Sequence, residues 1–352
     1  MPVPRDFLSG SETSLQRRLL RIVEGFAKCR VVVVGDVIVD EFMYGKPSRL
    51  SREAPVPILS YDGATTVPGG AGNAASNVGT LGGDSVLVGL LGRGEVDRSV
   101  YRALQGKVDI SFLLRPTLYR GPVKTRILAG SQHSTRQQLV RVDRESSGFD
   151  TSIGQEFDRV ALSAIADADA VIVSDYGSGL VTPSLVSRLK SKLTRRRRRR
   201  AIPVVVDSRY HLQRFLGCTA YTPNQSEVEE AVGVRIGDDS RLLEKAGRAL
   251  LKRTGAKGLV ITRGSRGMTV FEPRRRTSHI PIFGTDEIAD VTGAGDTVIA
   301  SLALALSVGA SLYEAACVAN YAGGLVVMKQ GTATVKNEEL VAAVESDDVR
   351  DQ

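Results

Sequence analysis

Uninterrupted apolar runs alternate along this chain with segments of helical periodicity, and this alternation restricts the possible folds more than any other feature. Strands buried on both faces of a parallel sheet carry such runs, because neither face meets water. The runs are residues 31–34, 86–91, 171–174, 204–206 and 259–262. The helical segments are residues 95–105, 154–166, 182–193, 225–232, 240–254, 294–307 and 311–328. The pattern predicts an α/β fold with a doubly wound, mostly parallel sheet flanked by helices.

Two segments, residues 41–66 and 118–142, interrupt this rhythm because neither holds a long helical pattern. Both are rich in Pro, Thr, Tyr and Val with alternating polar residues, which is typical of strands. We expect them to form a small separate β-sheet that covers a site as a lid. The alternative is a pair of long irregular loops, which are uncommon inside compact domains unless they are functional.

Composition restricts the class of protein. The chain has 352 residues, of which 42% are hydrophobic and 24% charged, as in soluble globular proteins. The net charge is +8, and residues 195–200, all arginine, supply six of these charges, which leaves +2. No aromatic residue is interleaved with the run, so we interpret it as an exposed connection between a helix and a strand. A non-catalytic protein that binds nucleic acid or an anionic surface through this run is the alternative of another functional class.

The N-terminus and the cysteines indicate a cytoplasmic protein. Residues 1–10 do not resemble a signal peptide, and the apolar stretch 298–312 is too short to cross a membrane. The cysteines at positions 29, 218 and 317 fit neither a disulfide framework nor a metal site. We expect residues 1–27 to be a helical extension that packs on a single domain, residues 28–352.

A phosphate-binding motif precedes one apolar helical segment. Gly293, Ala294 and Gly295 stand where the helix is expected to begin, and their backbone N–H groups can close on a phosphate. Asp296 follows directly, and a carboxylate beside a bound anion is suited to take a proton from a hydroxyl that attacks phosphorus. The alternative is a Gly-rich connection into a buried helix, with Asp296 as an ordinary first-turn residue.

Other residues are suited to contact a polyol. Gly69 and Gly70 let the backbone approach a ligand closely, and Asn73 offers both a donor and an acceptor. Asp36 and Asp40 follow the first strand, and carboxylates at the carboxyl edge of a parallel sheet face the usual ligand crevice. A turn before a helix and a solvated loop are the structural alternatives.

Two further motifs lie in the second half of the chain. Asn224 is placed to cap a helix whose first turn carries Glu227, an arrangement that needs no ligand. A Gly-rich turn with Gly264 and Gly267 follows the strand that ends at Thr262, and a hairpin alone would explain it.

In this order and spacing, the motifs resemble the signature of the ribokinase-like (PfkB) carbohydrate kinases, over about residues 28–345. The matching residues are Gly69-Gly70 with Asn73, Thr222-Pro223-Asn224 with Glu227, Thr262 with Gly264 and Gly267, and Asp290 with Gly293-Ala294-Gly295-Asp296. The resemblance implies a ribokinase-like fold and an ATP-dependent sugar kinase that uses Mg²⁺.

Shorter segments resemble the bacterial kinases of D-glycero-β-D-manno-heptose 7-phosphate, which phosphorylate the anomeric hydroxyl of that sugar on the way to ADP-heptose. The segments are residues 48–57, 124–126, 138–143, 174–176 and 331–335. The chain departs from that pattern at Ser178 and Arg209, where those kinases carry lysines. A PfkB-family kinase of another sugar, sugar phosphate or nucleoside is the alternative.

The resemblance and the residues together imply individual roles. Asp296 is expected to be the catalytic base, with Gly293 to Gly295 as the anion hole. The residues expected to bind ATP are Asn224, Glu227 (also to Mg²⁺ through water), Thr262, Gly264, Gly267 and Asn320. The residues expected to bind the substrate are Asp36, Asp40, Gly69, Gly70, Asn73, Lys124, Arg126, Arg141 and Asp175. A monovalent cation such as K⁺ is expected at Asp290 and Thr292.

The expected small sheet also predicts an assembly. An exposed apolar face on such a sheet is a poor monomer surface, and relatives pair through it, so we expect a twofold homodimer joined lid to lid. The residues assigned to that face are Val56, Ile58, Leu59, Ile127 and Leu128. The nucleotidyltransferase domain often fused to these kinases is expected to be a separate protein. No nucleic-acid or membrane partner is expected.

Overall fold

The apolar runs pair side by side in one nine-stranded sheet, which the computed structural model describes together with the rest of residues 6–130, 136–195, 200–284, 290–329 and 331–346. Its order is β13-β12-β11-β10-β9-β8-β1-β4-β5, parallel except for β12 and β13 at one edge. The strands are β1 (Arg30–Gly35), β4 (Asp84–Leu90), β5 (Leu113–Leu114), β8 (Ala170–Asp175), β9 (Val204–Ser208), β10 (Ala220–Tyr221), β11 (Gly258–Thr262), β12 (Met268–Phe271) and β13 (Ser278–Ile280). The predicted doubly wound α/β fold is confirmed.

The continuous apolar runs arise because helices cover both faces of this sheet. In β1, Val31 and Val33 pack into one core, and Val32 and Val34 into the other. Helices α2, α3, α8, α9 and α10 contribute to the first core and α4, α5, α6 and α7 to the second. The helices are α1 (Asp6–Glu24), α2 (Ala71–Thr80), α3 (Glu95–Leu104), α4 (Thr151–Ala164), α5 (Pro183–Thr194), α6 (Gln225–Val232), α7 (Ser240–Thr254), α8 (Ala294–Ser307), α9 (Leu312–Val327) and α10 (Asn337–Ser346).

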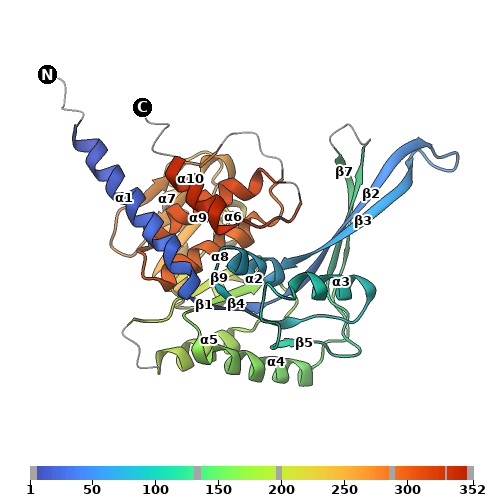
Figure 1. Ribbon diagram of the computed structural model, residues 1–352, viewed down its shortest axis with the longest axis horizontal. Coiled ribbons are helices and arrows are strands. Elements are labelled where there is room, and N and C mark those ends of the chain that lie inside the picture. Colours follow the sequence, from blue (N-terminus) through green and yellow to red (C-terminus); the bar gives the residue numbers. More distant parts are fainter. Residues whose placement is uncertain (1–5, 131–135, 196–199, 285–289, 330, 347–352) are drawn as a thin grey trace.

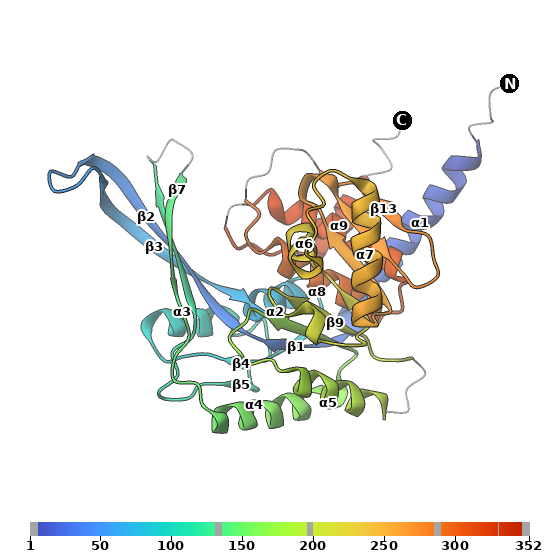
Figure 2. The same ribbon diagram turned by 180° about the vertical axis from the view of Figure 1, so that it is seen from behind.

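Helix α1 packs against α9 and α10, on the side of the core opposite the small sheet (Figures 1 and 2). Leu19, Ile22 and Val23 are buried there, as expected of a helical extension that packs on the domain. The division of the chain at residue 28 into an extension and a domain stays a prediction. Within the described ranges, no helix is both long and apolar enough to cross a bilayer.

A separate four-stranded sheet projects from the core (Figure 1). It consists of β2 (Val37–Leu50), β3 (Pro57–Gly70), β6 (Val123–Ala129) and β7 (Gln137–Arg144), in the order β3-β2-β6-β7. The two segments that lack helical periodicity therefore meet in one small sheet, as predicted. Its first strand starts only two residues after β1 ends, and β3 leads directly into α2.

The expected apolar face of this sheet is wrong in its membership. Neighbouring residues of a strand point to opposite faces, so Ile127 and Leu128 of β6 cannot share one face, nor can Ile58 and Leu59 of β3. Residues paired across strands do share a face, and the pairs Met43–Ile127, Ile127–Val140 and Thr125–Val142 define it. Val140 and Val142 are each 48% exposed, so part of this face is apolar and open to solvent in the single chain, although Glu41 and Thr125 lie on the same face.

Short elements escaped the periodicity analysis. β5 and β10 have two residues each and β13 has three, too few for a pattern to register. The small-residue helix α2 and the hairpin from β11 to β12 lie where the sequence placed them.

The two described residues of the arginine run, Arg195 and Arg200, lie in the connection from α5 to β9, at the amino ends of the parallel strands. Residues 196–199 fall outside the described ranges. Arg195 is the C-cap of α5, and Arg200 donates a hydrogen bond to the carbonyl of Val308 at 3.1 Å. Replacing the six arginines with serine should leave the affinity for ATP within about twofold of the parent value, because we interpret the run as an exposed connection, where substitutions have small effects. Titration calorimetry measures this, and a tenfold loss would contradict the placement.

Candidate active site

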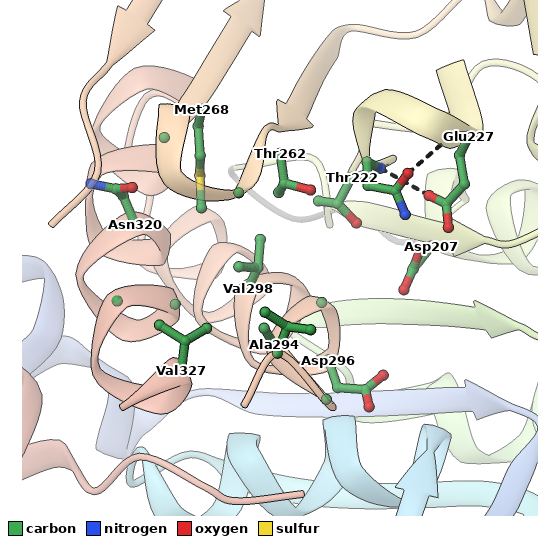
Figure 3. A pocket seen from close by; sticks show the side chains of 18 of the residues that line it. Asp207, Thr222, Glu227, Thr262, Met268, Ala294, Asp296, Val298, Asn320 and Val327 are labelled. Carbon is green, nitrogen blue, oxygen red and sulfur yellow. Dashed lines mark hydrogen bonds between the residues drawn. The ribbon is translucent and has the colours of Figure 1, made fainter. Parts of the chain in front are cut away.

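A cavity of about 420 Å³ opens where the core strands end and α8 begins. Asp207, Thr222 and Thr262 reach it from the ends of β9, β10 and β11. In Figure 3, Asp296 and Asn320 lie far apart along the cavity, with Asp207 and Glu227 on the side away from Asn320. This is the carboxyl edge at which ligands bind in doubly wound folds.

Asp296, in the first turn of α8, is buried, with 3% of its surface exposed. The Asn73 side-chain amide donates to Oδ2 at 2.8 Å, and the Tyr176 hydroxyl donates to Oδ1 at 3.0 Å. Burial raises the pKa of Asp296 to about 7, although both hydrogen bonds act in the opposite direction. A carboxylate with such a pKa can take up a proton and release it near neutral pH.

Asn73 is itself fixed by a buried polar network that joins α2 to α8. Asn77 donates to the Asn73 side-chain oxygen at 3.2 Å, and Thr297 donates to the Asn77 side-chain oxygen at 3.1 Å. Gly293 has φ 79°, and a Cβ there would lie 2.6 Å from the Asn73 amide nitrogen. Only glycine therefore allows this close approach.

The start of α8 provides the expected donors for an anion. Gly293, Ala294 and Gly295 line the cavity, and the first N–H groups of a helix have no intrahelical acceptor. The Ala294 N–H donates to the carbonyl of Val291 at 3.3 Å, so one of the three predicted donors has an acceptor within the chain. The role of this turn as an anion hole stays a prediction.

Asn224 and Glu227 form the predicted capping box of α6. The Asn224 N–H donates to the Glu227 carboxylate at 2.8 Å, and the Glu227 N–H donates to the Asn224 side chain at 2.9 Å. Both residues also line the cavity, so the cap and the site use the same side chains. Figure 3 shows these hydrogen bonds as dashed lines.

Negative charge gathers at the end of the cavity near Asp296. Burial raises the pKa of Asp207 well above its usual range, and the charges of Glu227 and Asp296 raise it further. Burial also raises the pKa of Glu227. A hydrated Mg²⁺ that arrives with a nucleotide would offset the negative charge of these carboxylates. Mg²⁺ keeps several of its waters, so the ion needs few protein ligands. Among the described residues, no group of three or more His, Cys, Asp and Glu is placed to hold a metal directly.

The other end of the cavity is apolar. Met268, Val298 and Val327 line it, and a planar aromatic group fits such walls. Asn320 lies there and donates to the carbonyl of Pro281 at 2.8 Å. The turn after Thr262 also lines the cavity, and Gly264 and Gly267 have φ 58° and 72°, which favour glycine.

The residues expected on the sugar side come from the small sheet and the start of α2. Asp40 forms a buried ion pair with Arg126 at 2.6 Å, and a Cβ at Gly69 would clash with the Asp40 carboxylate. The Lys124 amine lies 5.1 Å from the centre of the Tyr176 ring.

Arg141 lies opposite Arg126 in the next strand. Its guanidinium group donates two hydrogen bonds to the Asp143 carboxylate, at 2.8 and 2.9 Å. It is therefore on the same face of the small sheet as Arg126. Its side chain is exposed, and its contact with a substrate stays a prediction.

Asp36 and Asp175 have structural partners. The Asp36 carboxylate accepts from the Tyr176 N–H at 2.7 Å and from the Ser178 hydroxyl. Asp175 accepts from the Ser208 hydroxyl at 2.7 Å and from the Gly177 N–H at 3.1 Å. These contacts hold the turn that follows β8, and a direct sugar contact of either aspartate stays a prediction.

Asp290 and Thr292 lie just before α8. The Asp290 carboxylate accepts from the Thr292 N–H at 2.8 Å and from the Gly331 N–H at 3.1 Å. Residues 285–289, which precede them, lie outside the described part of the chain. The monovalent cation site stays a prediction.

Tyr176 and Asp207 are site residues to which the sequence analysis gave no role. Asp207 lies near the end of β9, so the rule that singled out Asp36 at the end of β1 would also have found it. The resemblance of residues 174–176 to the heptose kinases does not reveal the role of Tyr176, because its partner Asp296 is 120 positions away.

Replacing Asp296 with asparagine should stabilise the free protein at pH 8 and should do so much less at pH 5. The folded pKa of about 7 lies above the ordinary value of 3.8, so the folded state loses stability as pH rises through this interval. Asparagine stays neutral, and Tm at pH 8 should rise by on the order of 2–5 °C in calorimetry. Equal changes of Tm at both pH values would show that ionisation of Asp296 is not the cause.

Comparison with known proteins agrees with the motifs. Residues 29–339 match the model of the pfkB family carbohydrate kinases. The chain is 39% identical over 337 residues to the bifunctional protein HldE of Caulobacter vibrioides and 39% identical over 324 residues to that of Proteus mirabilis. The alignments cover 93% and 91% of this chain, which spans about two thirds of the relatives' length, 66% and 64%.

The solved structure of Arabidopsis thaliana ribokinase complexed with ribose and ATP matches with a TM-score of 0.71 at 18% identity, over 90% of this chain and 99% of that one. Escherichia coli phosphofructokinase-2 in complex with potassium matches with a TM-score of 0.72 at 17% identity, over 90% and 98%. At such identity the likeness shows the ribokinase-like fold alone. With the family model, it confirms what the four motifs predicted: the chain belongs to the pfkB family of carbohydrate kinases.

Proposed function

We propose that this carbohydrate kinase transfers the γ-phosphoryl group of ATP to the anomeric hydroxyl of D-glycero-β-D-manno-heptose 7-phosphate. The observation that carries the proposal is the position of Asp296. Its buried carboxylate lies between the cavity at the ends of β9 to β11 and the polar residues Asp40, Asn73 and Lys124. A nucleotide in the cavity and a sugar beside those residues would meet at this carboxylate.

The proposed reaction needs one proton transfer and one phosphoryl transfer in line. Asp296 accepts the proton of the sugar hydroxyl as that oxygen attacks the γ-phosphorus, and the bond from phosphorus to the β-phosphate oxygen breaks. The N–H groups at the start of α8 stabilise the transferred phosphoryl oxygens. Mg²⁺, held through water near Glu227, would offset phosphate charge.

Positive side chains on the sugar side support a phosphorylated acceptor. Burial lowers the pKa of Lys124, and Asp40 and Arg209 lie close enough to influence it as well. With Arg141, these cations can pair with a phosphate on the far end of the sugar. The segments that resemble heptose 7-phosphate kinases support that acceptor, and another sugar phosphate is the alternative because Ser178 and Arg209 depart from the pattern.

Further parts of the proposal concern the small sheet, the monovalent cation and a second enzyme. The small sheet closes over the sugar and excludes water, which would otherwise compete as phosphoryl acceptor. K⁺ or a similar cation occupies the loop of Asp290 and Thr292. A separate nucleotidyltransferase acts later in the same pathway.

The test is a screen of free and phosphorylated sugars with ATP and Mg²⁺, with the position of the new phosphate read by phosphorus NMR. Heptose 7-phosphate should give the 1,7-bisphosphate at the highest kcat/KM. Asp296→Asn should keep ATP affinity and lose turnover by roughly 10²–10⁴-fold, because the base is gone. Turnover of the variant within threefold of the parent would remove Asp296 as base, and phosphate at another position would change the acceptor.

We also propose a twofold homodimer that buries the face of the small sheet defined by Met43, Ile127, Val140 and Val142. Val140→Glu with Val142→Glu should give monomers in light scattering, because charge cannot be buried unpaired in an interface. Leu118→Glu is the control, since Leu118 is 82% exposed and lies outside the four strands. A parent protein that is monomeric at micromolar concentration would overturn the proposal.

A further inference from the structure

We propose that Tyr176 is a positioning residue that fixes the Asp296 carboxylate for proton transfer and links it to the small sheet. The inference rests on the proposed function, because it takes Asp296 as the base. Tyr176 follows β8 directly and lines the cavity. Four contacts converge on this one residue, from β6, the end of β3, the residue after β1 and the first turn of α8.

The hydroxyl contact fixes the orientation of the carboxylate. Tyr176 donates to Oδ1 of Asp296 at 3.0 Å while Asn73 donates to Oδ2 at 2.8 Å. The two donors come from different elements, so rotation of the carboxylate would break at least one hydrogen bond. A carboxylate oxygen accepts about two hydrogen bonds, so each oxygen keeps an acceptor position for a substrate hydroxyl.

Backbone contacts hold the tyrosine itself. Its N–H donates to the buried Asp36 carboxylate at 2.7 Å. Its ring lies against Gly70, where a Cβ would be 3.2 Å from the Cε2 atom of the ring. The ring therefore packs against bare backbone at the end of β3, which leaves the hydroxyl little freedom to leave Asp296.

The face of the ring contacts the small sheet. The Lys124 amine lies 5.1 Å from the ring centre, within the range of a cation–π interaction. Lys124 belongs to β6, and no salt bridge to an acidic side chain is found for it among the described residues. The ring thus contacts the small sheet through Lys124 and the proposed base through its hydroxyl. A shift of β6 relative to the core would therefore change the position of the hydroxyl.

The charged groups near Asp296 decide how its ionisation responds. Asp40 of β2 and Asp207 of β9 are acidic and disfavour the charged carboxylate, whereas Lys124 of β6 favours it. The hydroxyl of Tyr176 also favours the charged form, and burial raises the pKa of this tyrosine well above its ordinary value, so it stays a donor. Loss of the hydroxyl leaves Asp296 with one fewer donor and raises its pKa.

Tyr176→Phe tests the inference because it keeps the ring and removes only the hydroxyl. We expect kcat to fall about tenfold with unchanged KM for ATP, and the acidic limb of kcat/KM against pH to move up by about one pH unit. Tyr221→Phe is the matched control: this buried tyrosine bonds the carbonyl of Phe215, away from Asp296. The control should keep the pH limb of the parent.

Asp296→Asn and the double variant separate the two proposals. If Tyr176 acts through Asp296, then Tyr176→Phe added to Asp296→Asn should lower single-turnover rates by less than about twofold. Full activity of Asp296→Asn would overturn Asp296 as the base and with it the role of Tyr176, whereas the acceptor and the product are tested separately by the sugar screen. An inactive Asp296→Asn, together with a Tyr176→Phe protein whose kcat and pH limb match the parent, would overturn only the role of Tyr176.

Discussion

Burial of the Asp296 carboxylate is the constraint on which the rest of the site depends. A charge taken out of water is costly unless donors surround it, and here the donors are Asn73 and Tyr176. Each donor must be held in place by the chain. Asn77 and Thr297 hold the first through a network that joins α2 to α8, and Asp36 holds the second through the turn after β8. These buried polar residues beneath the cavity thus hold one carboxylate, that of Asp296, in place.

Two strands of the small sheet, β2 and β3, are connected to that support by very short links. β2 starts at Val37, two residues after β1 ends, and β3 passes at Gly70 directly into α2. Asp40 and Asn73 therefore lie close to the points where the sheet joins the core. A shift of the small sheet relative to the core acts on these residues first, because no long loop intervenes to absorb it.

The departures from the heptose kinase pattern have a local physical account. The hydroxyl of Ser178 bonds the Asp36 carboxylate, so at this position the side chain stabilises the turn after β8 instead of presenting a charge. Arg209 follows β9, where its N–H donates to the carbonyl of Asp175 at 3.0 Å, and its charge acts on both Asp207 and Glu227. Of the two positions at which the heptose kinases carry lysine, the one after β9 thus keeps a positive charge as Arg209, and the one after β8 loses it as Ser178.

The sequence by itself determined the class of fold and the motifs of the site. Continuous apolar runs indicate strands that are covered on both faces of a sheet. The glycines before Asp296 indicate a backbone that another group approaches closely, which here is the Asn73 side chain at Gly293. Both are local properties, so periodicity and residue type were sufficient. The capping box of Asn224 and Glu227 was predictable for the same reason, since its partners are three residues apart.

Only the tertiary structure decided which distant residues meet. The fold of the core brings Asn73, Tyr176 and Asp296 together. Burial there raises the pKa of Asp296 and the two hydrogen bonds lower it, and neither effect can be predicted from one segment of the sequence. The apolar face of the small sheet was misassigned because strand register, and not composition, selects which of two neighbours faces outward. Hydrophobic pattern acts over a few residues, whereas the site depends on contacts between elements separated by a hundred positions or more.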